Sequence, residues 1–152
     1  VLEDLRQALY ASKICAYAQG FNLLEEAGKV YGWDLQMGRI AKIWRSGCII
    51  RARFLDTVSE IFEKENGMTN LLASGYFSQV LYGARAGWGR IISLAVERGA
   101  AVPALSSTLA YFDSYRTARG SANLLQAQRD CFGAHTYERI DKEGAFHTDW
   151  MN

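Results

Sequence analysis

The chain has 152 residues, 49% of them hydrophobic and 22% charged, a composition typical of a single globular domain and not of a disordered chain. Seventeen basic and sixteen acidic side chains give a net charge of +1, which does not favour nucleic acid or an anionic membrane as the main partner. Three widely spaced cysteines disfavour a disulfide scaffold and a zinc site. No apolar run reaches the roughly 18 residues of a membrane span, and no signal-peptide pattern opens the chain, so we expect a cytoplasmic protein without a metal or a membrane partner.

The first predicted helix spans residues 2–30, where leucines such as Leu2 and Leu9 recur at helical spacing. A strip of small residues runs beside the leucines and would let another helix approach closely. The strip consists of Ala8, Ala11, Cys15 and Ala18. Gly32 is the expected end of this helix, because glycine adopts the left-handed conformation of a helix C-terminus without strain.

Two further helices are predicted in the next part of the chain. Asp34 is a plausible N-cap for a helix that runs to Trp44, and another helix is expected over residues 49–64. Basic residues of this region are followed directly by acidic ones. That pattern indicates solvated helix faces with ion pairs between residues four apart.

The second half of the chain predicts three more helices. A loop is expected at residues 66–70 from its turn chemistry, and a helix from residue 76 to residue 98 follows, ended by Gly99. Its predicted inward face consists of Phe77, Leu81, Ala84, Trp88, Ile91 and Ala95. Pro103 opens a helix that is expected to end at residue 118, because the first turn of a helix tolerates proline. A last helix spans residues 122–132.

These segments predict an all-α fold of five or six helices with an extended C-terminal tail. Helical periodicity ends near Gly133, and the tail carries large aromatic side chains without a helix of its own to bury them. The tail could dock on another surface or fold back on its own domain. Gly87-Trp88-Gly89 begins like a dinucleotide-binding loop, but it lies within a helical segment with no strand before it. Helix-packing glycines are therefore the better interpretation.

Arg129 and His135 are the candidate anion-binding pair, and they flank the predicted end of the last helix. A guanidinium can bond two phosphate oxygens at once, and an imidazole can donate a further hydrogen bond. Local chemistry alone favours an alternative, in which Arg129 pairs with Asp130 or Glu138 and His135 caps the helix end.

Five tracts of the sequence resemble one enzyme family. They are KICAYAQGFNLL (13–24), AKIWRSGCIIRARFL (41–55), YFDSYR (111–116), ANLLQAQRDCFGAHTYERID (122–141) and GAFHTDW (144–150). Their length and order make the chain similar to the last third of 6-phosphogluconate dehydrogenase.

The resemblance implies an enzyme that oxidatively decarboxylates 6-phosphogluconate to ribulose 5-phosphate with NADP, in the pentose phosphate pathway. It implies a cytoplasmic homodimer that needs no metal. Residues 1–133 would then form the second helical set of the C-terminal domain, and residues 134–152 a tail that docks on the partner subunit. Arg129 and His135 would bind the substrate in the partner subunit's site.

The same resemblance implies that the chain alone is inactive. The NADP-binding domain and the catalytic lysine and glutamate of the family lie upstream of the matched part, so we expect no catalytic or cofactor-binding residue in this chain. The sequence departs from the family pattern at Gly120-Ser121, usually Leu-Pro, at Cys131, usually aromatic, and at Ser46, usually glycine. Two other hypotheses stay open, namely a helical binding or dimerisation module without chemistry and a short regulatory or vestigial paralogue.

Overall fold

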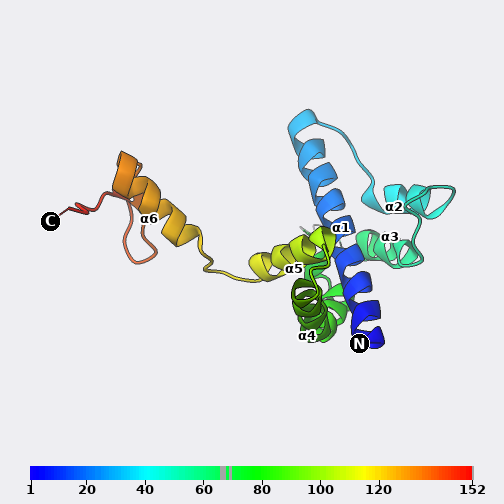
Figure 1. Cartoon of the computed structure of the whole chain (residues 1–152). Helices are drawn as coiled ribbons and strands as arrows, with labels where there is room; N and C mark the ends of the chain where they lie inside the picture. Colours follow the sequence, from blue (N-terminus) through cyan, green and yellow to red (C-terminus); the bar gives the residue numbers. More distant parts are fainter. Residues whose placement is uncertain (66–67, 69, 152) are drawn as a thin grey trace. The chain divides into compact units, whose positions relative to one another are not determined.

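The computed structural model describes residues 1–65, 68 and 70–151 (Figure 1). In this part of the chain it contains six α-helices, one short 3-10 helix and two short strands. In chain order they are α1 (Leu2–Tyr31), α2 (Met37–Arg45), α3 (Leu55–Lys64), η1 (Leu71–Ala73), α4 (Gly75–Glu97), α5 (Pro103–Tyr115), α6 (Ala122–Gly133), β1 (Tyr137–Glu138) and β2 (Ala145–Phe146). The predicted all-α fold is confirmed. The chain forms two compact units, Val1–Phe112 and Asp113–Asn152.

The small-residue strip of α1 is its buried face and packs on α4, as its composition predicts. All four members of the strip are fully buried. A two-pronged ion pair joins the helices, with Arg90 Nη2 at 2.7 Å from Asp4 Oδ1 and Arg90 Nε at 2.9 Å from Asp4 Oδ2. A Cβ on Gly87 would lie only 2.7 Å from Asp4 Oδ1. The interpretation of Gly87 as a helix-packing glycine is therefore confirmed.

The leucines of α1 lie mostly outside this core. Leu2 is 83% exposed and Leu23 is 70% exposed. The small residues occupy the interior face because they let the backbone of α4 come close, and large leucine side chains would hold the two helices apart. The first unit therefore keeps an apolar stripe at its surface.

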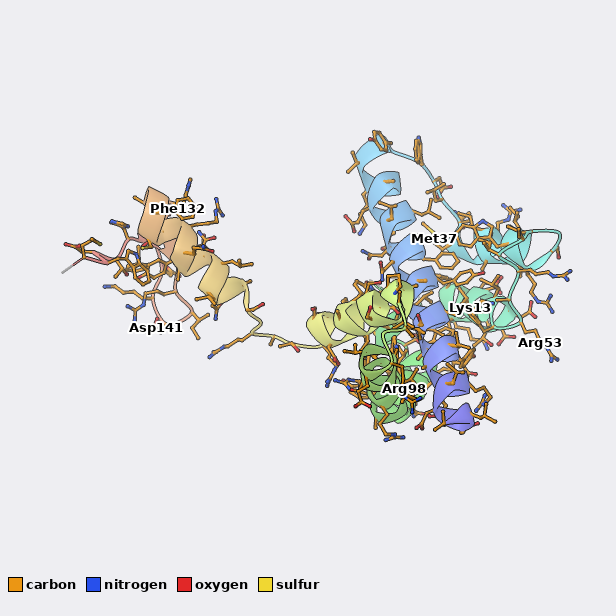
Figure 2. All side chains as sticks on the ribbon, viewed as in Figure 1. Lys13, Met37, Arg53, Arg98, Phe132 and Asp141 are labelled. Atoms are coloured by element: carbon orange, nitrogen blue, oxygen red, sulfur yellow. The ribbon has the colours of Figure 1, made fainter. Side chains whose placement is uncertain are left out.

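The predicted inward face of α4 is confirmed. Its members are Phe77, Leu81, Ala84, Trp88, Ile91 and Ala95, and all of them are buried. Trp88 is fully enclosed, and its indole N–H donates a hydrogen bond to the Leu105 carbonyl at 3.1 Å. The side chains of the first unit converge between its helices (Figure 2), where they form one continuous apolar core.

The helix ends that depend on glycine and proline are also as predicted. Gly32 and Gly99 end α1 and α4 with φ angles of 68° and 65°, a conformation that glycine adopts without a steric penalty. Pro103 is the first residue of α5, although this helix ends at Tyr115 and not at residue 118.

Other predicted boundaries are wrong. Gln36, not Asp34, precedes the first turn of α2, and Asp34 Oδ1 instead accepts a hydrogen bond from the side-chain Nε2 of Gln36 at 2.9 Å. α3 begins at Leu55, because the preceding residues form turns and leave Ile49 99% exposed. Of the loop predicted at residues 66–70, positions 66, 67 and 69 lie outside the described residues, while Asn70 caps η1.

The acidic and basic blocks pair differently from the prediction. Lys42 reaches Glu63 at 2.6 Å and Arg45 reaches Asp56 at 3.0 Å, so these ion pairs join α2 to α3. The expected spacing of four within one helix occurs only weakly in this region, with Lys64 at 3.6 Å from Glu60.

Candidate functional site

The second unit consists of α6, the last turn of α5 and a tail that folds back as a small hairpin. β1 and β2 pair in antiparallel fashion, with Tyr137 opposite Phe146. The tail that the sequence predicts to be extended thus contains a short hairpin. Strands of two residues are too short to produce a recognisable alternation in the sequence.

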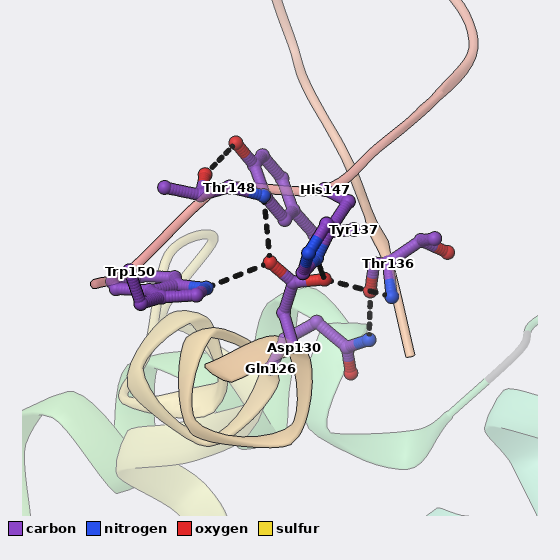
Figure 3. Close-up of polar contacts among 7 residues, drawn as sticks. All are labelled: Gln126, Asp130, Thr136, Tyr137, His147, Thr148 and Trp150. Carbon is purple, nitrogen blue, oxygen red and sulfur yellow. Dashed lines mark hydrogen bonds and ion pairs between the residues drawn. The ribbon is translucent and has the colours of Figure 1, made fainter. Parts of the chain in front are cut away.

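Asp130 is the only buried side chain among the described residues of this unit. Its Oδ1 accepts hydrogen bonds from the Thr136 amide at 3.0 Å and from His147 Nδ1 at 2.9 Å. Its Oδ2 accepts hydrogen bonds from the Thr148 amide at 3.0 Å and from Trp150 Nε1 at 2.9 Å. These five residues are called the Asp130 hub below (Figure 3). A carboxylate has about four lone-pair sites, so the buried charge is fully satisfied.

The hub keeps its carboxylate ionised. Burial alone would raise the pKa of Asp130, but the hydrogen bonds from the Thr148 amide, His147 and Trp150 together hold that pKa well below its usual range. An ionised carboxylate only accepts hydrogen bonds, so His147 donates through Nδ1. The carboxylate of α6 therefore fixes the tail from Thr136 to Trp150.

His135 lies in a turn whose backbone is held on both sides. Ala134 and Thr136 have φ angles of 49° and 59°, in the left-handed region that is unfavourable for residues with a side chain. The Ala134 amide donates to the Asp130 carbonyl at 2.9 Å. Asp130 Oδ1 binds the Thr136 amide, and Gln126 Nε2 donates to the Thr136 carbonyl at 2.5 Å. The surroundings of His135 thus determine its backbone position.

The imidazole of His135 rests against the end of α6. A Cβ on Gly133 would lie 2.7 Å from His135 Nε2 and 2.8 Å from Cδ2, so the ring occupies the space that any larger residue would need. The Phe132 ring meets the imidazole edge-on, with the ring centroids 6.0 Å apart. His135 is exposed, and a ligand can reach it from solvent.

Arg129 is exposed on α6, and its Nη1 donates to Gln126 Oε1 at 3.1 Å. The alternative pairing with Asp130 is wrong, because the hub occupies both oxygens of that carboxylate. His135 is not the helix cap either, since Ala134 takes that position. A guanidinium has five N–H donors, so Arg129 keeps donors for an anion. Gln126 bonds both Arg129 and the residue after His135, and the two predicted site residues are joined through this one amide.

Neither a metal-binding cluster nor a dinucleotide-binding unit occurs within the described ranges. No cluster of three or more His, Cys, Asp or Glu side chains is arranged to hold a metal ion there. A dinucleotide-binding unit needs a parallel strand, a glycine-rich turn and a helix, and the two strands described are short and antiparallel. None of the described helices is both long and apolar enough to cross a bilayer.

Sequence reasoning missed three residues that shape this site, namely Gln126, Asp130 and Gly133. Gln126 and Asp130 lie four residues apart and so share one face of α6. A pair of polar residues on one helix face, followed by the donor-rich tract His147-Thr148-Asp149-Trp150, was the available signal.

The sequence matches the family described as 6-phosphogluconate dehydrogenase, C-terminal domain, over residues 1–150. The NADP(+)-dependent, decarboxylating 6-phosphogluconate dehydrogenase of Bacillus subtilis (strain 168) is 54% identical over 151 residues, which cover 99% of this chain and 32% of that protein. The decarboxylating 6-phosphogluconate dehydrogenase 1 of Oryza sativa subsp. japonica is 51% identical over 151 residues, with the same two coverages.

A solved structure agrees with these relatives. The 6-phosphogluconate dehydrogenase of Plasmodium falciparum, determined in its apo form, with NADP+ and with 6-phosphogluconate, superimposes with a TM-score of 0.92 at 40% sequence identity. The match covers 97% of this chain and 32% of that one, so the chain spans about a third of the length of its relatives. The chain belongs to the 6-phosphogluconate dehydrogenase family, and it corresponds to the C-terminal domain of that family.

Proposed function

We propose that this chain is the C-terminal part of an NADP-dependent dehydrogenase that converts 6-phosphogluconate to ribulose 5-phosphate and CO2. In this proposal Arg129 and His135 bind the substrate phosphate. The enzyme would act in the cytoplasm, in the pentose phosphate pathway. The relatives named above carry this activity in their names, and the Plasmodium falciparum protein was determined with the same substrate and cofactor.

One observation carries the assignment of the phosphate contacts. Arg129 and His135 are both exposed, and Gln126 bonds Arg129 and also the carbonyl of Thr136, the residue that follows His135. A phosphate carries two negative charges near neutral pH and several strong acceptor oxygens, which suit a fixed guanidinium fork with an imidazole beside it. Hydrogen bonds of Gln126 to Arg129 and Thr136, and of Asp130 to the Thr136 amide, hold that geometry before any ligand binds.

The chain would supply no chemistry of its own. When NADP is bound, it accepts the hydride in the oxidation step, and its binding site would lie in the upstream part of the enzyme. The described residues contain no parallel strand followed by a glycine-rich turn and a helix, the unit that a dinucleotide cofactor usually needs. We therefore expect the 152-residue chain to produce no NADPH from 6-phosphogluconate.

The second unit also supports a role in dimerisation, with residues 134–152 as a tail that docks on the partner subunit. The unit spans only residues 113–152, a size at which domains usually need a disulfide, a metal or a partner. All three cysteines of the chain are free. Leu124 is 74% exposed and Phe132, labelled in Figure 2, is 71% exposed. An apolar surface of this kind suits contact with a second subunit.

A mixing experiment tests whether the phosphate contacts cross between subunits. In the full-length enzyme, an Arg129→Ala subunit is mixed with a subunit that lacks the upstream catalytic lysine, and the dimers are dissociated and reassembled. If Arg129 serves the partner's site, each heterodimer holds one intact site and one doubly defective site. Activity then returns on mixing.

Two other results would contradict this proposal. If Arg129 acts within its own subunit, every site stays defective and mixing restores no activity. If the Arg129→Ala enzyme is as active as the unaltered enzyme before mixing, Arg129 has no role in the substrate site. The hypothesis of a helical dimerisation module without chemistry would then be favoured for this chain.

A further inference from the structure

We propose that Gln126 is a positioning residue, which aligns the Arg129 guanidinium and the His135 turn toward one substrate phosphate. The inference rests on the proposed function. Gln126 does not touch the phosphate in this account and acts through its two neighbours.

The side-chain amide of Gln126 is half-buried and uses both of its ends. Nε2 donates to the Thr136 carbonyl at 2.5 Å, and Oε1 accepts from Arg129 Nη1 at 3.1 Å. The two contacts select one orientation of the amide, because only its nitrogen can donate to a carbonyl and only its oxygen can accept from a guanidinium. A shift of either neighbour therefore displaces the other.

The contact with Thr136 also controls His135. Thr136 has a left-handed backbone, with its amide held by Asp130 and its carbonyl held by Gln126. Without Gln126, Thr136 would be held on one side only, and rotation toward an ordinary backbone conformation would swing the adjacent imidazole. Ordering a flexible binding group in advance lowers the entropic cost of ligand binding.

Steady-state kinetics of the full-length enzyme test the inference. Gln126→Met preserves the length of the side chain and removes both hydrogen bonds. We expect the KM for 6-phosphogluconate to rise about three- to tenfold while kcat changes less than about twofold, since the lost interaction concerns binding of a non-reacting group. Gln128→Met is the matched control, because Gln128 is the same residue type and is exposed on the same helix. Its KM should remain that of the unaltered enzyme.

A double variant distinguishes positioning from a general effect on the fold. In an enzyme that already carries Arg129→Ala and His135→Ala, Gln126→Met should cause no further rise in KM, because its effect passes through those two residues. An equal rise in this background would overturn the inference. So would an unchanged KM in the single Gln126→Met enzyme while Arg129→Ala raises it.

Two further results would be interpreted differently. If neither Arg129→Ala nor His135→Ala changes KM, the proposed function fails as well. If Gln126→Met loosens the tail, seen as loss of the Trp150 indole N–H resonance of the hub, Gln126→Glu decides. This variant keeps an acceptor for Arg129, lacks the donor to Thr136 and adds a negative charge, whose repulsion of the phosphate would persist without Arg129 and His135. A raised KM that occurs with the Trp150 resonance intact and disappears in the Arg129→Ala and His135→Ala background supports positioning, and an unchanged KM contradicts it.

Discussion

The two compact units bury opposite kinds of side chain. The first encloses a continuous apolar core that extends from α1 to Phe112 in α5, with Trp88 and Phe77 fully buried. The second encloses one carboxylate, Asp130, and leaves its large apolar side chains exposed. Burial of apolar side chains stabilises a unit in proportion to the area buried and does not depend on the direction of any single contact. A hub of hydrogen bonds instead fixes directions, which suits the role proposed for Arg129 and His135 as substrate contacts.

The largest effect should come from the core of the first unit. Trp88→Ala removes a fully buried ring and leaves a cavity, which typically costs about 3–5 kcal/mol of the free energy of unfolding. Trp33→Ala is the control, because the Trp33 ring is exposed and stacks only on Tyr31. Chemical denaturation followed by circular dichroism measures both. Equal losses for the two variants would show that the first unit does not depend on the Trp88 core.

The next effect concerns the hub. Asp130→Asn keeps the shape of the side chain but replaces one acceptor oxygen by an N–H donor, which faces donors from the tail. We expect hydrogen exchange at the Thr136 and Thr148 amides to become at least tenfold faster, while the α4 amides of the first unit keep their protection. Asp141→Asn is the control, since Asp141 is exposed and bonds only Arg139 among the contacts described. Unchanged exchange at Thr136 and Thr148 would refute the hub as the anchor of the tail.

Acid should loosen the second unit only at unusually low pH. The pKa of folded Asp130 is lowered relative to the unfolded chain, so its stabilisation is fully present above the ordinary aspartate value. That stabilisation is lost as the pH falls through the lowered value. The Trp150 indole N–H resonance should persist through the range in which exposed carboxylates titrate. Its disappearance near pH 4 would mean that Asp130 titrates like an exposed aspartate.

The smallest expected effect is a difference in reactivity between a cysteine of the first unit and a cysteine of the second. Burial in the apolar core raises the pKa of Cys15 to about 12, so at pH 8 it is almost entirely the unreactive thiol. Cys131 is exposed on α6. Iodoacetamide should therefore modify Cys131 in the folded chain and leave Cys15 intact, as read by peptide mass spectrometry. Modification of Cys15 at a comparable rate would contradict a closed first unit.

The features predicted correctly from the sequence are local ones. The inward face of α4 follows from a period of 3.6 residues, and the ends at Gly32 and Gly99 follow from the backbone freedom of glycine. The choice between the leucine stripe and the small-residue strip of α1 depends on which helix packs against it. Periodicity alone could not make that choice.

The Asp130 hub could not be predicted, because it too depends on contacts between distant parts of the sequence. Its donors His147, Thr148 and Trp150 lie 17, 18 and 20 residues beyond Asp130, in a tail without helical or strand periodicity. The polar face of α6 and the tract from His147 to Trp150 are visible in the sequence, but no local pattern reports that the two meet. Local chemistry named Arg129 and His135 as a candidate pair but favoured a pairing of Arg129 with Asp130 or Glu138, and the resemblance to known enzymes is what favours the two residues as substrate contacts.

The central claim is that Arg129 binds the phosphate of the substrate, and a comparison of two ligands tests it directly. The dissociation constants of 6-phosphogluconate and of gluconate, which lacks the phosphate, are measured for the unaltered full-length enzyme and for Arg129→Ala. Loss of a charge-assisted contact should weaken 6-phosphogluconate roughly tenfold to a hundredfold and leave gluconate unchanged. Equal weakening of both ligands, or no change in either, would contradict the account.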